Sequence, residues 1–155
     1  MWIVYTKNIT LQIPESYPLE AAGPVFCAGI TMFSPLNNWK ANAGGKRVGI
    51  VGIGGLGQMG IRLAKAMGNT VVAISSSPNK KEAAMELGAD EFVVSKDPES
   101  LKTVEKSLDL ILNTVSADHD ITTYLQLLAR NSHESQKNPF VLDSSFPLKI
   151  FFQTF

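Results

Sequence analysis

The sequence predicts an α/β fold in which helices cover both faces of a doubly wound parallel β-sheet. Short apolar runs without polar alternation recur along the chain, and such runs suit parallel strands that are buried on both faces. Segments with helical spacing of apolar residues separate these runs, and glycines at Gly68 and Gly88 close two of them. Strands that alternate with helices in this way are typical of parallel β-α-β units. The strands are expected at 47–51, 70–74, 91–94 and 108–112, and the helices at 59–67, 79–87, 99–106 and 121–129.

The composition is that of a globular protein with one main domain. The 155 residues include 14 basic and 14 acidic side chains, and 45% are hydrophobic. Balanced charge gives no reason to expect nucleic acid or an acidic membrane surface as a partner. No stretch reads as a secretory signal or as long and apolar enough to span a bilayer, and the single cysteine, Cys27, cannot form an internal disulfide. We therefore expect a cytoplasmic protein without membrane or nucleic acid partners.

A glycine cluster directly follows the first predicted strand of the sheet. Gly52, Gly54 and Gly57 form the pattern G-x-G-x-x-G, which leads into a predicted helix. In a Rossmann-type dinucleotide-binding unit the first glycine allows a tight turn, the second lets the pyrophosphate approach the backbone, and the third lets the helix pack close to the strand. The free N–H groups and the dipole at the helix start then hold the phosphates. The alternative is a glycine-rich turn without a ligand.

The end of the second strand predicts which dinucleotide is bound. Units that prefer NAD carry an acidic residue about 20 positions past the glycines, where it binds the ribose 2′-hydroxyl. Here that place holds Ser75 and Ser76, Lys80 follows, and no acid appears before Glu82. Hydroxyl and ammonium groups donate to a 2′-phosphate, which a carboxylate would repel, so the sequence favours NADP. The alternative is that Ser77 caps the next helix and that the lysine is solvated.

Three segments are expected along the chain. Residues 1–36 hold a strand at 9–13 and a buried inter-domain helical segment, broken or kinked at Pro24 and stopped at Pro35. Residues 37–130 form the NADP-binding Rossmann domain. Residues 131–155 are an atypical tail, polar and then rich in phenylalanine, which leaves the sheet incomplete at its C-terminal edge. Homo-oligomer formation or other self-association through this open edge is one expectation.

Two motifs resemble the zinc-dependent medium-chain alcohol dehydrogenase family. One is residues 18–31 (PLEAAGPVFCAGIT), followed by Ser34 and Pro35, and the other is residues 51–60 (VGIGGLGQMG). Within the family the chain looks most similar to the cinnamyl-alcohol-dehydrogenase type, which are NADP-dependent reductases of aldehydes. The resemblance covers about 13–129 and includes the serine cluster in the right order.

The resemblance implies roles for residues at matching positions. Cys27 matches one protein ligand of the family's catalytic zinc, and Thr31 matches a residue on the nicotinamide side of the cleft. Ser75, Ser76 and Lys80 match contacts of the 2′-phosphate, and 113–117 matches a loop that passes the cofactor. The expected cofactor-binding residues are Thr31, Gly52, Gly54, Gly55, Leu56, Gly57, Ser75, Ser76, Lys80, Asn113 and Val115.

The zinc site of the family is incomplete in this sequence. A catalytic zinc needs three protein ligands, and in the family the others come from a preceding catalytic domain that we do not find here. The chain has one cysteine, and its histidines, His119 and His133, match no ligand position. We therefore expect Cys27 to be a buried small apolar side chain and zinc not to be bound.

Three functions remain open. The first is a truncated form of an NADP-dependent zinc alcohol dehydrogenase with little or no activity alone; the intact relative would move a hydride between NADPH and an aldehyde, or from a primary alcohol in reverse. The second is a stand-alone NADP-binding module that acts as a sensor or as a partner of another chain. The third is a zinc-free relative of the quinone-reductase type, against which the two motifs argue. Whether the chain alone is an enzyme is left open.

Overall fold

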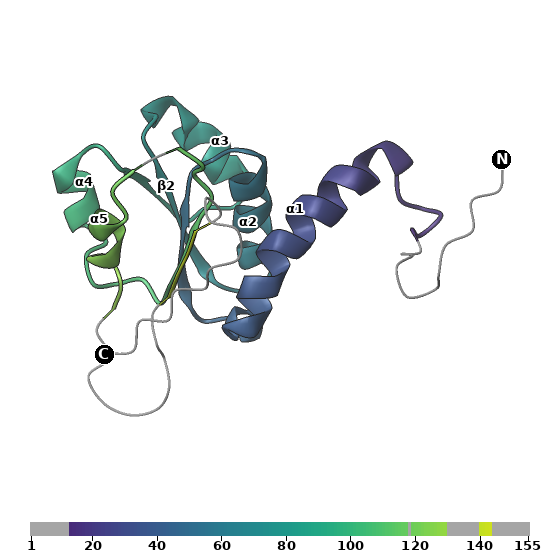
Figure 1. The fold of residues 1–155 in the computed structure, drawn as a ribbon, viewed down its shortest axis with the longest axis horizontal. Helices are drawn as coiled ribbons and strands as arrows, with labels where there is room; N and C mark the ends of the chain where they lie inside the picture. Colours follow the sequence, from purple (N-terminus) through teal and green to yellow (C-terminus); the bar gives the residue numbers. More distant parts are fainter. Residues whose placement is uncertain (1–12, 118, 130–139, 144–155) are drawn as a thin grey trace.

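The computed structural model describes residues 13–117, 119–129 and 140–143, and their core is a parallel β-sheet (Figure 1). Its five strands lie in the order β3-β2-β1-β4-β5, and each neighbouring pair is parallel. The strands are β1 (Arg47–Val51), β2 (Thr70–Ser75), β3 (Glu91–Val94), β4 (Leu110–Asn113) and β5 (Phe140–Asp143). The predicted fold class is confirmed, and the four strands expected from the sequence are present.

Helices cover both faces of the sheet (Figure 1). The first core lies under α1 (Leu19–Asn38), α2 (Gly55–Ala66) and α3 (Lys81–Glu86), and it includes Met32, Ile50 and Ile61. The second core lies under α4 (Pro98–Lys102) and α5 (Thr122–Leu125), and it includes Val51 and Tyr124. Neighbouring residues of β1 thus point into opposite cores, which explains the absence of polar alternation. Two short 3₁₀-helices, η2 (Ala41–Ala43) and η3 (Pro78–Lys80), complete the described elements.

Helix α1 runs through both of its prolines without the break or early stop expected from the sequence. It continues from Leu19 to Asn38, past Pro24 and Pro35. The carbonyls that lose a helical donor to these prolines belong to Glu20 and Thr31, and both residues are exposed, so water can replace the missing bonds. The expectation that no segment has the length and apolar composition of a bilayer span is also wrong. Helix α1 meets that criterion by length and composition, which core helices of soluble proteins and signal sequences near an N-terminus meet as well.

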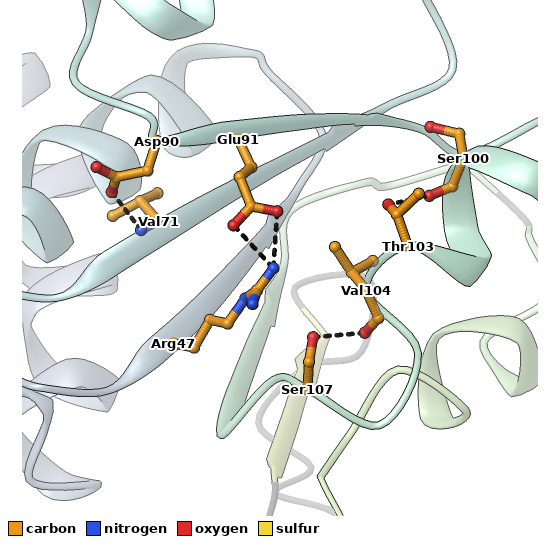
Figure 2. Close-up of polar contacts among 8 residues, drawn as sticks. All are labelled: Arg47, Val71, Asp90, Glu91, Ser100, Thr103, Val104 and Ser107. Atoms are coloured by element: carbon orange, nitrogen blue, oxygen red, sulfur yellow. Dashed lines mark hydrogen bonds and ion pairs between the residues drawn. The ribbon is translucent and has the colours of Figure 1, made fainter.

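The helices that cover the second core are shorter than expected. At the end of α4, Thr103 Oγ1 donates to Ser100 O at 2.7 Å and Ser107 Oγ donates to Val104 O at 2.7 Å, as Figure 2 shows. These hydroxyls satisfy carbonyls that a longer helix would have bonded. Residues 126–129 leave α5 because their backbone pairs with 106–108, through bonds such as Leu108 N to Leu127 O at 3.0 Å. Pairing between distant segments therefore overrides the local helical pattern.

The tail expected beyond residue 130 supplies a strand. Residues Phe140–Asp143 form β5, which pairs in parallel with β4 from Leu110↔Phe140 to Asn113↔Asp143. The expectation of an open edge at 108–112 is wrong in this respect, because β5 covers that edge. The strand expected at 9–13 lies outside the described residues except for Ile13, which belongs to no strand.

A polar network ties the amino ends of three strands together, at the end of the sheet away from the glycine cluster. Arg47 of β1 reaches past β2 to Glu91 of β3, and its Nη2 donates to the two carboxylate oxygens at 2.8 and 2.7 Å (Figure 2). Asp90 accepts from Val71 N at 2.8 Å and from the Lys65 ammonium of α2. Burial raises the pKa of Asp90, but these two donors outweigh it and leave the pKa below its usual value.

Replacement of Asp90 by alanine is expected to lower the free energy of unfolding by about 1–2 kcal/mol at neutral pH, because Val71 N loses its acceptor. A carboxyl whose pKa is lowered by folding stabilises the fold above its unfolded pKa, and that contribution is lost as the pH falls through the folded value. The deficit should therefore shrink below about pH 4. Urea unfolding of the variant and the wild type at neutral pH and below about pH 4 measures the difference in the free energy of unfolding. Glu99→Ala, in an exposed pair with Lys102, is the control and should change little. An equal deficit at both pH values would contradict the ionic part of this account.

Candidate cofactor-binding site

Three segments that the sequence predicts to bind the cofactor meet at the carboxyl edge of the sheet. Gly52 follows β1, Ser75 ends β2, and Asn113 ends β4. Strands β2 and β4 lie on opposite sides of β1, so the direction of winding reverses there. In open α/β sheets, ligands bind beside the carboxyl ends of the strands at such a reversal. The candidate site is therefore the space between the glycine turn, the end of β2 and the loop after β4.

Two glycines of the cluster are required by close contacts within the protein. Gly52 has φ +87°, and a Cβ there would lie 2.8 Å from Val115 Cγ2 and 3.0 Å from Thr114 Oγ1. A Cβ on Gly57 would lie 1.8 Å from Gly52 O, so only glycine lets α2 start this close to the turn. Both positions thus have the turn and packing roles expected from the motif.

Gly54 and Gly55 face open space instead. A Cβ on either residue would meet no atom of the described residues within 4 Å. Gly54 is the N-cap of α2 with φ −100° and ψ −163°, an extended conformation that other residues also adopt. The packing of the part of the chain that the structure describes therefore does not explain why this residue lacks a side chain. The first N–H groups of a helix, here including those of Gly55 and Leu56, have no intrahelical acceptor, so this space beside α2 suits an anion.

The end of β2 carries the hydroxyl and ammonium groups expected there. Ser75 is buried, and its Oγ accepts from Ser77 N at 3.2 Å, whereas Ser76 is exposed. Lys80 extends from η3 to the glycine turn, where its Nζ donates to Ile53 O at 3.1 Å. Ser77 does occupy the N-cap of η3, but its side chain makes no cap hydrogen bond. The lysine ammonium is thus held beside the glycine turn.

The loop after β4 is tied to the glycine turn by a residue that the sequence did not single out. Thr114 Oγ1 lies 2.8 Å from Val51 O and 3.1 Å from Gly52 O. Asn113 is buried, and its Oδ1 accepts from Val115 N at 3.2 Å. Asn113 and Val115 were expected from the sequence, and the structure places both at the site. The signal for Thr114 was its hydroxyl directly after a buried strand, which faces the glycine turn only once the sheet forms.

The residues expected at the zinc and nicotinamide positions lie on α1. Cys27 is exposed, so the expectation that it is buried is wrong. Thr31 is exposed too, and its Oγ1 donates to Cys27 O at 2.8 Å. Among the residues that the structure describes, no group of three or more histidine, cysteine, aspartate or glutamate side chains could hold a metal ion. The described residues therefore do not fit a catalytic zinc, which needs three protein ligands.

Comparison with known proteins identifies the family. The model of a family described as zinc-binding dehydrogenase matches residues 55–133. NADP-dependent alcohol dehydrogenase C 1 of Mycolicibacterium smegmatis is 49% identical over 126 residues, which are 81% of this chain and 36% of the relative. A cinnamyl alcohol dehydrogenase structure from Sorghum bicolor superposes with TM-score 0.77 at 44% identity, over 90% of this chain and 39% of that one. A Helicobacter pylori structure described as CAD complexed with NADP(H) gives TM-score 0.72 at 33% identity, over 86% and 35%.

The chain thus spans about 36% of the length of its curated relatives. Within that length it contains the glycine turn, the serine cluster and the loop after β4 in one site. The chain belongs to the zinc-binding dehydrogenase family.

Proposed function

We propose that the chain binds NADP(H) and serves as the cofactor-binding part of an alcohol dehydrogenase or aldehyde reductase. The observation that carries the proposal is the open space over Gly54 and Gly55, at the N-terminus of α2 and next to the Lys80 ammonium. Helix N–H groups and the dipole favour the pyrophosphate in that space. Named relatives that depend on or contain NADP support this choice of dinucleotide.

Different residues of the chain would bind different parts of the cofactor. Backbone N–H groups at Gly55 and Leu56 would hold the pyrophosphate. The 2′-phosphate would accept from Ser75, Ser76 and Lys80. Val115 would lie along the nicotinamide half as part of the loop after β4. The bound cofactor supplies the hydride for reduction of an aldehyde or accepts it from an alcohol. The part of the chemistry that these residues perform is binding and orientation.

A second candidate is a binding module without chemistry of its own. The described residues hold no ligand set for zinc, so nothing among them would polarise a substrate carbonyl as a metal does. The two candidates predict the same cofactor affinity and differ in aldehyde reduction by the longer protein of which the chain would be a part. We propose that the 155-residue chain alone has little or no such activity.

The expected preference is tighter binding of NADPH than of NADH, and Ser75→Asp should reverse it. The new carboxylate would repel the 2′-phosphate and accept from a ribose 2′-hydroxyl, a change of about 1–3 kcal/mol in relative affinity. It would also keep an acceptor for Ser77 N, and because Ser75 is buried, a melting curve of the variant checks that the fold survives the added charge. Calorimetric titration of both cofactors measures the preference, with Ser75→Ala as the uncharged control. Equal affinities in the wild-type chain would end the NADP assignment.

Purified chain is expected to carry no stoichiometric zinc and to show no zinc-dependent aldehyde reduction. Cys27 is the one cysteine of the chain and lies exposed on α1. Elemental analysis after dialysis, with an assay at added zinc, measures both. One tightly held zinc per chain that disappears in Cys27→Ser would refute this prediction.

A further inference from the structure

The site contains a histidine for which the sequence suggested no role. His119 follows the loop after β4, and its Nε2 lies 2.7 Å from Nδ2 of the buried Asn113. Its other ring nitrogen, Nδ1, lies 2.7 Å from Ala117 O. The ring also packs against Tyr124 of α5 with 5.7 Å between ring centroids. Both nitrogens of the imidazole thus have a hydrogen-bond partner. One partner, Asn113, also bonds the backbone of the loop after β4 (the cofactor-side loop).

These partners define one protonation state. A carbonyl oxygen only accepts, so Nδ1 carries the proton that it donates to Ala117 O. The unprotonated Nε2 then accepts from the Asn113 amide nitrogen. That amide cannot be turned over, because its Oδ1 accepts from Val115 N at 3.2 Å. With its proton on Nδ1, the neutral ring therefore provides a donor for Ala117 O and an acceptor for the Asn113 NH₂, while Asn113 Oδ1 stays free to accept from Val115 N.

Protonation of His119 would break this arrangement. The imidazolium donates at both nitrogens, so Nε2–H would face the Asn113 NH₂ and one of the two would lack an acceptor. If the amide turned over, its NH₂ group would face Val115 N–H, and two donors would again meet without an acceptor. Two titratable side chains lie beside His119. Asp120 Oδ1 accepts from Thr122 N at 2.8 Å, and the ring of Tyr124 packs against the imidazole. Asp143 of β5 lies opposite Asn113 in the strand register.

The loop that Asn113 organises is in contact with the glycine turn. Val115 fills the space over Gly52, since a Cβ there would lie 2.8 Å from Val115 Cγ2, and Thr114 Oγ1 lies 3.1 Å from Gly52 O. A change in the hydrogen bonds of Asn113 and Val115 therefore acts on the turn that would hold the pyrophosphate.

We propose that His119 is a positioning residue whose neutral form orients Asn113 and thereby the cofactor-side loop, so that NADP(H) binding weakens as this histidine is protonated. The proposal rests on the proposed function, because NADP(H) is the ligand whose affinity it governs. His119 acts through Asn113 and does not itself touch the cofactor.

The test compares wild-type chain with His119→Gln. A glutamine carbonyl can accept from the Asn113 amide at any pH, so this variant keeps the acceptor and removes the titration. NADPH affinity is measured by calorimetry at about pH 8 and about pH 5.5, across the usual range of histidine. Every other titratable group, including the 2′-phosphate of the cofactor, is common to the two experiments, so its effect cancels in the comparison. We expect the wild-type affinity to fall about 5-fold to 30-fold more than that of the variant.

A second measurement needs no cofactor. In the wild-type chain the NMR signals of the Asn113 side-chain amide and of Val115 N–H should shift over the same pH range, whereas in His119→Gln they should stay constant. Equal pH dependence of affinity in the two proteins, with Asn113 signals that do not titrate, would overturn the role of His119 and leave NADPH binding intact. If neither protein binds NADPH, the proposed function fails, and the NMR titration still decides whether His119 controls Asn113.

Discussion

Replacing Gly57 with alanine is expected to lower the free energy of unfolding by about 3 kcal/mol or more, because overpacking against rigid backbone cannot be relieved by a side-chain rotation. The new Cβ would lie 1.8 Å from Gly52 O and 2.9 Å from Gly52 C, so α2 would have to move away from β1. That movement would open the first core, which contains Ile61 and Ala64 of this helix. Urea or thermal unfolding followed by circular dichroism measures the loss.

Gly55→Ala is the matched control for this substitution. It adds the same methyl group two residues earlier, in the first turn of α2, where none of the residues that the structure describes lies within 4 Å of the new Cβ. Its stability should equal or slightly exceed that of the wild type, because alanine has the higher helix propensity. A Gly57→Ala protein as stable as Gly55→Ala would mean that α2 and β1 do not pack as closely as described.

Gly54→Val is expected to abolish binding of NADPH and NADH while the fold stays intact. The side chain would project into the space proposed for the pyrophosphate, and its Cβ would meet no described part of the protein within 4 Å. The extended backbone at this N-cap suits a β-branched residue. Calorimetric titration of both cofactors measures binding, and a melting curve of the same sample measures the fold.

The two glycine variants separate the two uses of the motif. Gly57→Ala should lower the free energy of unfolding, whereas Gly54→Val should leave the fold intact and abolish cofactor binding. Undiminished NADPH affinity in a folded Gly54→Val protein would show that the cofactor lies elsewhere or is not bound.

The parts of the fold that were predicted correctly depend on neighbours in the sequence. Strand β1 follows from its apolar run, and the turn and packing roles of Gly52 and Gly57 follow from their position between that strand and a helix. The space over Gly54 follows from the same local pattern. Since these signals lie within a dozen residues, periodicity and spacing are sufficient to detect them.

The parts that were missed depend on segments far apart in the chain. The shortened α5 reflects backbone pairing of 126–129 with 106–108, and β5 reflects pairing of the tail with β4. The continuous α1 reflects exposure of the carbonyls that its prolines leave without donors. His119 became visible only through its distance to Asn113. No local pattern encodes such contacts, because folding creates them.

The central place of β1 has a consequence for how the chain folds. This strand pairs with β2 after one crossover, but its other partner, β4, lies two crossovers further along the sequence. Closing a longer loop costs more chain entropy before any pairing compensates for it, and non-local parallel pairing slows folding. We therefore expect the pair β1–β2 with α2 to form first, and the loop after β4 to reach the glycine turn in a later step. In that order, the turn proposed for the pyrophosphate would form before the rest of the candidate site.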